Sequence, residues 1–106
     1  MVKRGEVWLV CLDPTLGSEI RKTRPCVVMS PPELNQHLKT VIMAPMTSQG
    51  FAAPFRVPVS FQGKEGLVLL DQIRTVNKVR LVKKLGVVPS ATLQQVLLVM
   101  QDLFSA

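Results

Sequence analysis

Side chains that bind metals or form catalytic triads are scarce in this sequence. Its 106 residues include one histidine, His37, and two cysteines, Cys11 and Cys26, which lack Cys-x-x-Cys spacing. One histidine and two strand cysteines cannot supply the three or four ligands of a zinc centre. A Ser-His-Asp triad is disfavoured as well, because the one histidine falls in a predicted connecting segment. We therefore expect no metal and no cofactor, and buried thiols rather than a disulfide.

Long hydrophobic runs and acidic residues are also scarce. No stretch is apolar for long enough to span a bilayer, and residues 1–6 lack the apolar segment of a signal peptide. We expect a cytoplasmic protein without membrane contact. Seven acidic residues against thirteen basic ones give a formal net charge of +6, which favours a polyanionic partner such as nucleic acid or an acidic protein tail. A solubilising charge excess is the alternative.

The hydrophobic patterns predict one mainly β domain that ends in a helix. At 106 residues the chain is too short to bury two cores, so we expect a single domain over 1–106. Short apolar runs between turn signals predict strands at 6–12, 26–29, 40–46, 55–60, 66–70 and 81–88. From Ser90, its expected N-cap, a period of three to four residues predicts an amphipathic helix. This order indicates a small antiparallel barrel or curled sheet with the helix packed on it.

Prolines and serines mark the ends of other predicted elements. Pro58 assigns the fourth strand to a sheet edge or a bulge, because proline cannot donate to a ladder. Residues 31–36 could form one helical turn with Ser30 as its N-cap. His37 would then lie in the segment that follows.

The stretch 22–31 joins a cationic arm to a strand that is predicted to be buried on both faces. Pro25 biases Arg24 towards an extended backbone, so Arg24 is expected at the mouth of the strand. A guanidinium fixed at the rim of a rigid core can hold a phosphate. A surface arginine that happens to precede a strand is an equally good interpretation of this stretch alone. The polar loop before it, 13–23, could fold over whatever Arg24 holds.

Polar groups stand at the ends of three predicted strands: Arg24, Thr47 with Ser48, and Asp71. Strand ends that meet at a loop-covered face are where sites tend to be built. Without a metal, this set suits RNA cleavage, because the RNA's own 2′-hydroxyl is the nucleophile. Arg24 would neutralise the phosphorane oxygens and Thr47 would donate a hydrogen bond to them. Asp71 could act as a base, but a structural acceptor role at a turn is favoured.

The predicted C-terminal helix is apolar over more than half of its surface. The stripe consists of Leu93, Val96, Leu97, Met100, Leu103 and Phe104, widened by Leu98 and Val99. Together with Met29, Met43 and Met46 it exceeds what one small barrel can cover. We therefore expect a homodimer.

Five short blocks follow one another over nearly the whole chain. They are Arg4-Gly5-Glu6-Val7-Trp8-Leu9-Val10, Leu12-Asp13-Pro14-Thr15 with Gly17 and Glu19, Thr23-Arg24-Pro25, Pro45-Met46-Thr47-Ser48, and Gly66-Leu67-Val68 leading to Asp71-Gln72. Together they resemble the MazF/PemK (Kid) toxins of bacterial toxin–antitoxin pairs. The resemblance implies an SH3-like barrel, a homodimer, and a metal-independent, sequence-selective endoribonuclease that cuts single-stranded mRNA and leaves a 2′,3′-cyclic phosphate. It also implies a cognate antitoxin that blocks the site with an acidic, flexible tail.

Single positions carry this resemblance further. Arg24 and Thr47 match the arginine and threonine that serve catalysis in MazF-type members. The chain departs from the Kid-type pattern at Ser18, where some members have a histidine, and at Leu69, where they have an arginine. A mechanism that rests on an Asp–Arg–His set is therefore not expected, and the Arg24–Thr47 scheme is preferred. The candidate RNA-binding residues are Ser18, Glu19, Arg21, Lys22, Thr23, Ser48, Gln49, Phe51, Asp71 and Gln72.

Aromatic platforms for bases are few, since the chain has no tyrosine, one tryptophan and four phenylalanines. Phe51 is the best stacking candidate, with a loop-anchoring role as the alternative. Two other functions stay open: a gyrase-poisoning binding protein of the CcdB type and a non-catalytic nucleic-acid-binding module. The Thr23-Arg24-Pro25 and Thr47-Ser48 blocks favour the nuclease, because a gyrase poison has no need of an arginine–hydroxyl site.

Overall fold

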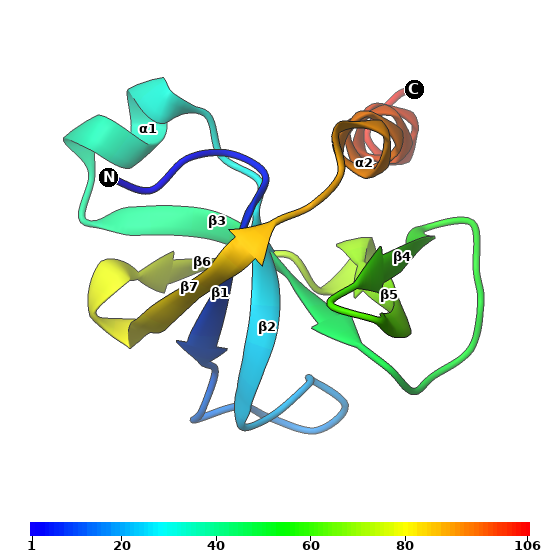
Figure 1. The fold of residues 1–106 in the computed structure, drawn as a ribbon, viewed down its shortest axis with the longest axis horizontal. Coiled ribbons are helices and arrows are strands. Elements are labelled where there is room, and N and C mark those ends of the chain that lie inside the picture. The colour runs from blue at the N-terminus through cyan, green and yellow to red at the C-terminus, as the bar shows by residue number, and fades with distance from the viewer.

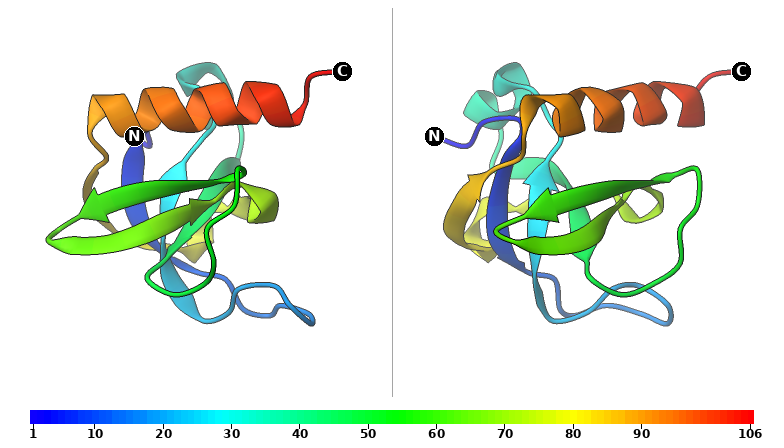
Figure 2. Two further views of the ribbon diagram at one scale, coloured as in Figure 1. Left: turned by 90° about the vertical axis from the view of Figure 1, so that its right-hand side faces the viewer. Right: turned by 45° about the vertical axis from the view of Figure 1, so that its right-hand side comes forward.

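Seven antiparallel strands form one strongly curled sheet, and one long helix lies across it (Figures 1 and 2). The computed structural model describes residues 1–106. The strands are β1 (Glu6–Cys11), β2 (Thr23–Val28), β3 (Thr40–Thr47), β4 (Arg56–Phe61), β5 (Lys64–Leu69), β6 (Arg74–Asn77) and β7 (Leu81–Val87). The helices are α1 (Pro32–His37) and α2 (Ser90–Leu103), with short 3₁₀ turns η1 (Leu70–Gln72) and η2 (Lys78–Arg80). The predicted mainly β fold with a C-terminal helix is confirmed.

Strand β3 is the hub of the sheet. The strand order is β4-β5-β3-β2-β1-β7, and β6 also pairs with β3. The first half of β3 pairs with β6 and its middle with β2, whereas its last two residues, Met46 and Thr47, pair with Val68 and Leu67 of β5. The sheet therefore curls into a half-barrel around the end of β3, and Thr47 lies where the two parts of the sheet meet.

The β4–β5 hairpin forms one edge of this half-barrel. β4 pairs only with β5, so Pro58 lies in an edge strand as predicted. Gln62 and Gly63 both have positive φ angles, 53° and 78°, and close a two-residue hairpin turn. On the far side of the half-barrel, the side-chain amide of Gln62 donates to the carbonyl of Leu85 in β7 at 2.9 Å.

Strand β2 is buried on both faces, as its apolar run predicted. Val27 belongs to a core between the sheet and α2, and Cys26 and Val28 belong to a second core on the opposite face. All three are fully buried. A strand between two cores has little freedom to shift, so β2 holds its polar end rigidly.

Helix α2 covers the first of these cores with one face. Val96 is fully buried, and Leu93, Leu97 and Met100 pack beside it. Figure 2 shows the helix lying above the β4–β5 hairpin. The rest of the stripe is open: Leu98, Leu103 and Phe104 are exposed. No helix in the structure has both the length and the apolar character needed to cross a membrane.

The methionines do not need a second subunit to cover them, so this part of the dimer prediction was wrong. Met29, Met43 and Met46 are all buried within this single chain, because the curl of the sheet gives it two cores instead of one. Of the apolar residues that predicted self-association, only the exposed part of the α2 stripe remains as support, beside the family resemblance.

Both predicted serine caps were also wrong. Ser30 is buried, where its hydroxyl donates to Asn35 Oδ1 at 2.5 Å and accepts from the Ile42 amide at 3.0 Å. A buried hydroxyl with two such partners is not available to cap a helix. Prolines take both N-cap positions, Pro31 for α1 and Pro89 for α2, and neither helix has a side-chain cap.

Further differences from the sequence prediction concern His37, the start of β2 and the strand β6. His37 is the last residue of α1 and not part of a connection. β2 begins three residues earlier than expected, so Arg24 is its second residue. β6 was not predicted at all, because only one of its four residues, Val76, is buried and so short a segment gives no clear alternation.

Candidate functional site

An open hollow of about 280 Å³ lies between the start of β2, the end of β3 and the β4–β5 hairpin. We call it the hairpin hollow, and it is lined by Arg24, Pro25, Met46, Thr47, Ser48, Val59, Phe61, Gln62, Lys64, Glu65, Gly66 and Leu85. It contains both predicted catalytic residues, Arg24 and Thr47, together with Ser48. Lys64 and Glu65 were not predicted here, because in the sequence they look like ordinary hairpin residues.

The register of β2 and β3 explains why Arg24 and Thr47 meet. The ladder pairs Val27 with Ala44 and Cys26 with Pro45. Continued by two residues, this register would set Arg24 opposite Thr47, although the β2–β3 ladder itself ends at Cys26 and Pro45. Both Arg24 and Thr47 line the hairpin hollow. Two residues far apart in sequence are thus brought together by strand pairing rather than by a loop.

Arg24 is held at one nitrogen and free at the other two. Its Nε donates to the carbonyl oxygen of Arg21 at 3.2 Å, and its terminal nitrogens have no partner in the chain. Thr47 Oγ1 accepts from the Gln49 amide at 3.1 Å, which leaves its hydroxyl proton free to donate. A two-nitrogen fork and a hydroxyl donor on one wall of a hollow can bind the non-bridging oxygens of a phosphate.

Gly66 forms the floor of the hairpin hollow beside Thr47. A Cβ atom at this position would lie 2.7 Å from the backbone oxygen of Thr47, well inside contact distance. Only glycine lets β5 approach the end of β3 so closely, which allows Leu67 to pair with Thr47.

A second, smaller hollow of about 170 Å³ lies at η1 and is called the η1 hollow. It is lined by Glu19, Ile20, Asp71, Gln72, Ile73 and Arg74. Three predicted RNA-binding residues, Glu19, Asp71 and Gln72, therefore line a different hollow from Arg24 and Thr47.

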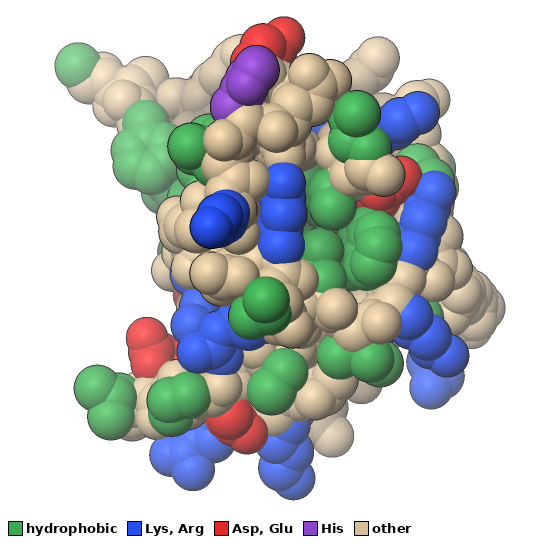
Figure 3. Space-filling model, turned by 90° about the vertical axis from the view of Figure 1, so that its left-hand side faces the viewer, with side chains coloured by type: hydrophobic (Ala, Val, Ile, Leu, Met, Phe, Trp, Pro, Cys, Tyr) green, Lys and Arg blue, Asp and Glu red, His purple; other side chains and the backbone are tan.

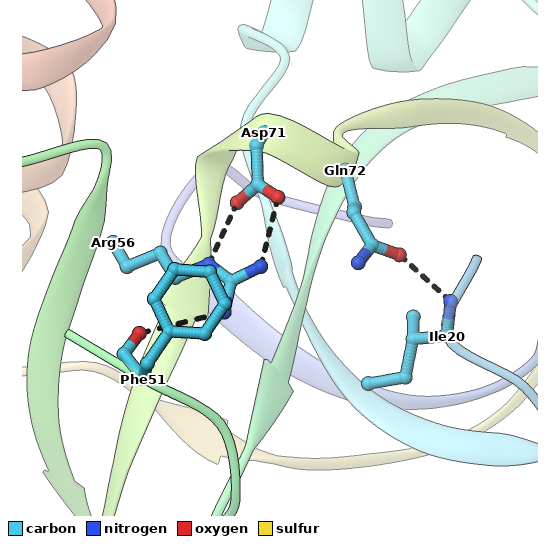
Figure 4. A network of polar contacts seen from close by, with 5 residues as sticks. All are labelled: Ile20, Phe51, Arg56, Asp71 and Gln72. Atoms are coloured by element: carbon cyan, nitrogen blue, oxygen red, sulfur yellow. Dashed lines mark hydrogen bonds and ion pairs between the residues drawn. The ribbon is translucent and has the colours of Figure 1, made fainter. Parts of the chain in front are cut away.

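Asp71 is engaged by Arg56, a residue that was not predicted (Figure 4). Nε and Nη2 of Arg56 contact the two carboxylate oxygens of Asp71 at 3.2 and 3.0 Å. The guanidinium also lies 4.4 Å from the ring centroid of Phe51. Both carboxylate oxygens of Asp71 thus accept within the chain, which agrees with the structural role favoured from the sequence, although the partner is a distant arginine and not its own turn. Arg56 gave no signal because its partner lies 15 positions away.

The remaining predicted RNA-binding residues lie on the β1–β2 and β3–β4 loops beside the hairpin hollow, except Thr23, which is the first residue of β2. All of them are exposed: Ser18, Arg21, Lys22, Thr23, Gln49 and Phe51. Figure 3 shows that basic side chains are also spread over the face that carries β6 and β7. Positive charge alone therefore does not single out the hairpin hollow as the site.

Comparison of the chain with known proteins shows the family to which it belongs. A model described as the PemK-like, MazF-like toxin of type II toxin–antitoxin systems matches residues 3–104. The chain belongs to this toxin family. It is 39% identical over 102 residues to Endoribonuclease PemK of Escherichia coli, an alignment that covers 91% of this chain and 77% of that protein.

Solved structures agree with the fold of this PemK/MazF-like toxin. MazF from Deinococcus radiodurans superposes with a TM-score of 0.85 at 27% identity, over 96% of this chain and 94% of that one. A MazE–MazF structure from the same organism gives a TM-score of 0.73 at 28% identity over the same shares. The predicted resemblance to the MazF/PemK toxins is confirmed.

The two thiols of the toxin lie apart from both hollows and are free. Burial raises the pKa of the Cys26 thiol to about 12, against the opposing charge of Arg74. A thiol with this pKa stays protonated and is a poor nucleophile. No three His, Cys, Asp or Glu side chains come together in a group that could hold a metal ion.

Proposed function

We propose that this toxin is a metal-independent, sequence-selective endoribonuclease that cuts single-stranded mRNA in the hairpin hollow. The observation that supports this most directly is that the free guanidinium nitrogens of Arg24 and the hydroxyl of Thr47 line the same hollow. The activity carried by the name of the Escherichia coli relative agrees with it. Chain 1–106 would act as one toxin domain.

In the proposed reaction the RNA supplies its own nucleophile. The 2′-oxygen forms a bond to the adjacent phosphorus while the bond to the 5′-oxygen breaks; the 2′-hydroxyl loses its proton and the 5′-oxygen gains one. Arg24 holds two phosphorane oxygens with its fork, and Thr47 donates a hydrogen bond to the same charge. The products are a 2′,3′-cyclic phosphate and a 5′-hydroxyl.

We further propose a cognate antitoxin with an acidic, flexible tail as the regulatory partner. The net charge of +6 and the MazE–MazF structure of the Deinococcus relative support it. The exposed apolar side chains Leu98 and Leu103 of α2 and Phe104 at its C-cap support a homodimer. The protein would work in the cytoplasm without membrane contact.

The deciding experiment is cleavage of a mixed single-stranded RNA by the purified protein in EDTA, with the ends of the products mapped. We expect cutting to persist at defined sequences and the upstream products to carry a cyclic phosphate. Complete loss in EDTA that magnesium restores would contradict the proposal. RNA binding without cutting would favour the non-catalytic module instead.

A further inference from the structure

The two loops beside the hairpin hollow are both held by contacts that begin at the same three-residue turn, η1. They are the β1–β2 loop, residues 12–22, and the β3–β4 loop, residues 48–55. η1 presents two consecutive side chains, and Figure 4 shows that they point to opposite loops: Asp71 towards Arg56 and Phe51, Gln72 towards Ile20. The contacts on each side can be followed as far as the proposed site.

On the first side, Asp71 acts through Arg56. The two residues make a forked ion pair at 3.0 and 3.2 Å, and the Arg56 side chain is only 11% exposed. From this position Arg56 Nη1 donates to the carbonyl of Phe51 at 3.4 Å and stacks under its ring. Phe51 as a residue is 66% exposed. Asp71 therefore holds Arg56, and Arg56 in turn holds Phe51. The outer face of the Phe51 ring stays open to solvent.

On the second side, Gln72 acts through the backbone of the β1–β2 loop. Its Oε1 accepts from the Ile20 amide at 2.7 Å. The next residue, Arg21, offers the carbonyl that holds Nε of Arg24 at 3.2 Å. Gln72 therefore fixes the segment that sets the direction of the Arg24 fork.

We propose that Asp71 and Gln72 are a pair of positioning residues. Asp71, through Arg56, holds Phe51 as a platform for one unpaired RNA base, and Gln72, through Ile20 and Arg21, aims Arg24 at the phosphate. Neither side chain touches the RNA, in contrast to the role expected from the sequence. This rests on the proposed function for its kinetic consequences, whereas the loop contacts are testable in the free protein.

The contact between Gln72 and the Ile20 amide is tested with two variants of similar size. Gln72→Met removes the acceptor and keeps the volume, and Gln72→Glu keeps an acceptor oxygen. In the free protein, hydrogen exchange at the Ile20 amide should speed up about 5- to 10-fold in Gln72→Met, the effect of one lost hydrogen bond, and stay slow in Gln72→Glu. The kcat for RNA cleavage should fall in Gln72→Met and be retained in Gln72→Glu. Gln94→Ala, at an exposed position of α2, should change neither quantity.

The added charge of Gln72→Glu raises KM for an anionic substrate, so kcat is the quantity to compare. If Gln72→Glu keeps Ile20 protected but loses kcat as fully as Gln72→Met, the amide contacts RNA and the proposal is overturned. Unchanged Ile20 exchange in Gln72→Met would overturn it too, even if the protein cut no RNA at all. If the wild type does not cleave RNA while the exchange results hold, the proposed function fails and the positioning contact stands.

The contacts from Asp71 through Arg56 to Phe51 are tested with a double-mutant cycle between Phe51→Ala and Arg56→Lys. Loss of one stacked base should raise KM in Phe51→Ala by about 5- to 100-fold. Arg56→Lys keeps the charge but not the fork, so it should reproduce most of that rise, and the double variant should be no worse than Phe51→Ala. Additive effects of the two substitutions would show that Arg56 does not act through Phe51.

Discussion

The hairpin hollow and the η1 hollow both collect polar side chains at the ends of buried strands, but they differ in what those side chains already bind. In the hairpin hollow, two nitrogens of Arg24, the hydroxyl proton of Thr47 and the ammonium of Lys64 have no partner in the chain. In the η1 hollow, Asp71 is held by Arg56 and Gln72 by the Ile20 amide.

This difference distinguishes polar residues that can act on a substrate from polar residues that hold the surrounding structure in place. A group can stabilise charge on a substrate only with atoms that are still free, whereas a group whose atoms are engaged keeps the surrounding backbone in place. Substitutions in the hairpin hollow should therefore reduce chemistry more than stability, and substitutions around the η1 hollow should loosen loops.

The sharpest test of this contrast is Arg24→Lys. Lysine keeps the charge but cannot reproduce the planar fork, so we expect cleavage to slow about 100- to 1,000-fold, the scale of a removed oxyanion donor. RNA binding should weaken far less, because one charge contact among many is altered. Single-turnover cleavage and equilibrium binding on the same variant, with the melting temperature as a check of folding, measure this.

Arg21→Lys is the matched control, since the Arg21 side chain is exposed and only its backbone carbonyl holds Arg24. It should leave cleavage within a few-fold of the wild type. Retained cleavage in Arg24→Lys would remove Arg24 from the mechanism, and equal losses of cleavage and binding would make it a simple anchor.

Gly66→Ala should reduce both the stability of the fold and the rate of cleavage, so the two effects coincide at this position. The new methyl group would lie 2.7 Å from the Thr47 carbonyl oxygen, which forces β3 and β5 apart. We expect a loss of about 1–3 kcal/mol in the free energy of unfolding and about a hundred-fold slower cleavage from a displaced Thr47. Urea unfolding and cleavage rates report the two effects.

Gly63→Ala provides the comparison for this variant. Gly63 has a φ of 78° but open space around its Cβ position, so only backbone strain of about 1 kcal/mol is expected. Normal cleavage in Gly66→Ala would mean that the position of Thr47 is unimportant.

Glu6 is a side chain outside both hollows whose polar atoms, like those of Asp71 and Gln72, already have partners in the chain. Its carboxylate is 7% exposed and accepts from Lys84 Nζ at 2.9 Å, the Lys3 amide at 3.0 Å and Trp8 Nε1 at 3.1 Å. Burial acts to raise the pKa of Glu6, but these partners outweigh it and hold the pKa below its ordinary value of 4.5.

A lowered pKa in the folded state means that the charged form stabilises the fold. The contribution is fully present above the unfolded pKa and is lost as the pH falls through the folded pKa. Glu6→Gln should therefore cost about 1–3 kcal/mol at neutral pH and reduce the acid-induced loss of stability, while exposed Glu33→Gln should do neither. Urea unfolding followed by circular dichroism from pH 7 down to pH 3 measures both; an unchanged acid profile in Glu6→Gln would contradict the assignment.

Lys64→Met should have the smallest effect. Lys64 lines the hairpin hollow at its exposed rim, where it can attract the RNA backbone without touching the reacting phosphate. We expect a few-fold weaker binding, an unchanged kcat and a reduction of about 0.7 in the salt slope of RNA binding, the value for one phosphate contact on a single strand. A large fall in kcat would instead place Lys64 among the reacting groups.

The sequence predicted the hairpin hollow well because the hollow follows from strand ends. The apolar run 26–29 and the run before Thr47 predicted both strands, and the antiparallel pairing of β2 with β3 brings their ends, with Arg24 and Thr47, to the same hollow. The η1 contacts were not predictable in this way. Arg56 reaches Asp71 across 15 positions and Gln72 reaches Ile20 across 52, and long side-chain contacts of this kind leave no periodic signal. The predicted Ser30 cap failed for a related reason, because the buried Asn35 engages Ser30.

The contact between Trp8 and Glu6 gives this protein a built-in optical probe. The chain has no tyrosine and a single tryptophan, so its ultraviolet emission comes from one indole. The indole N–H donates to Glu6 Oε1, on a strand that pairs directly with β2. Emission from the unmodified protein therefore reports protonation of Glu6 and any parting of β1 from its neighbours, without a label near the RNA.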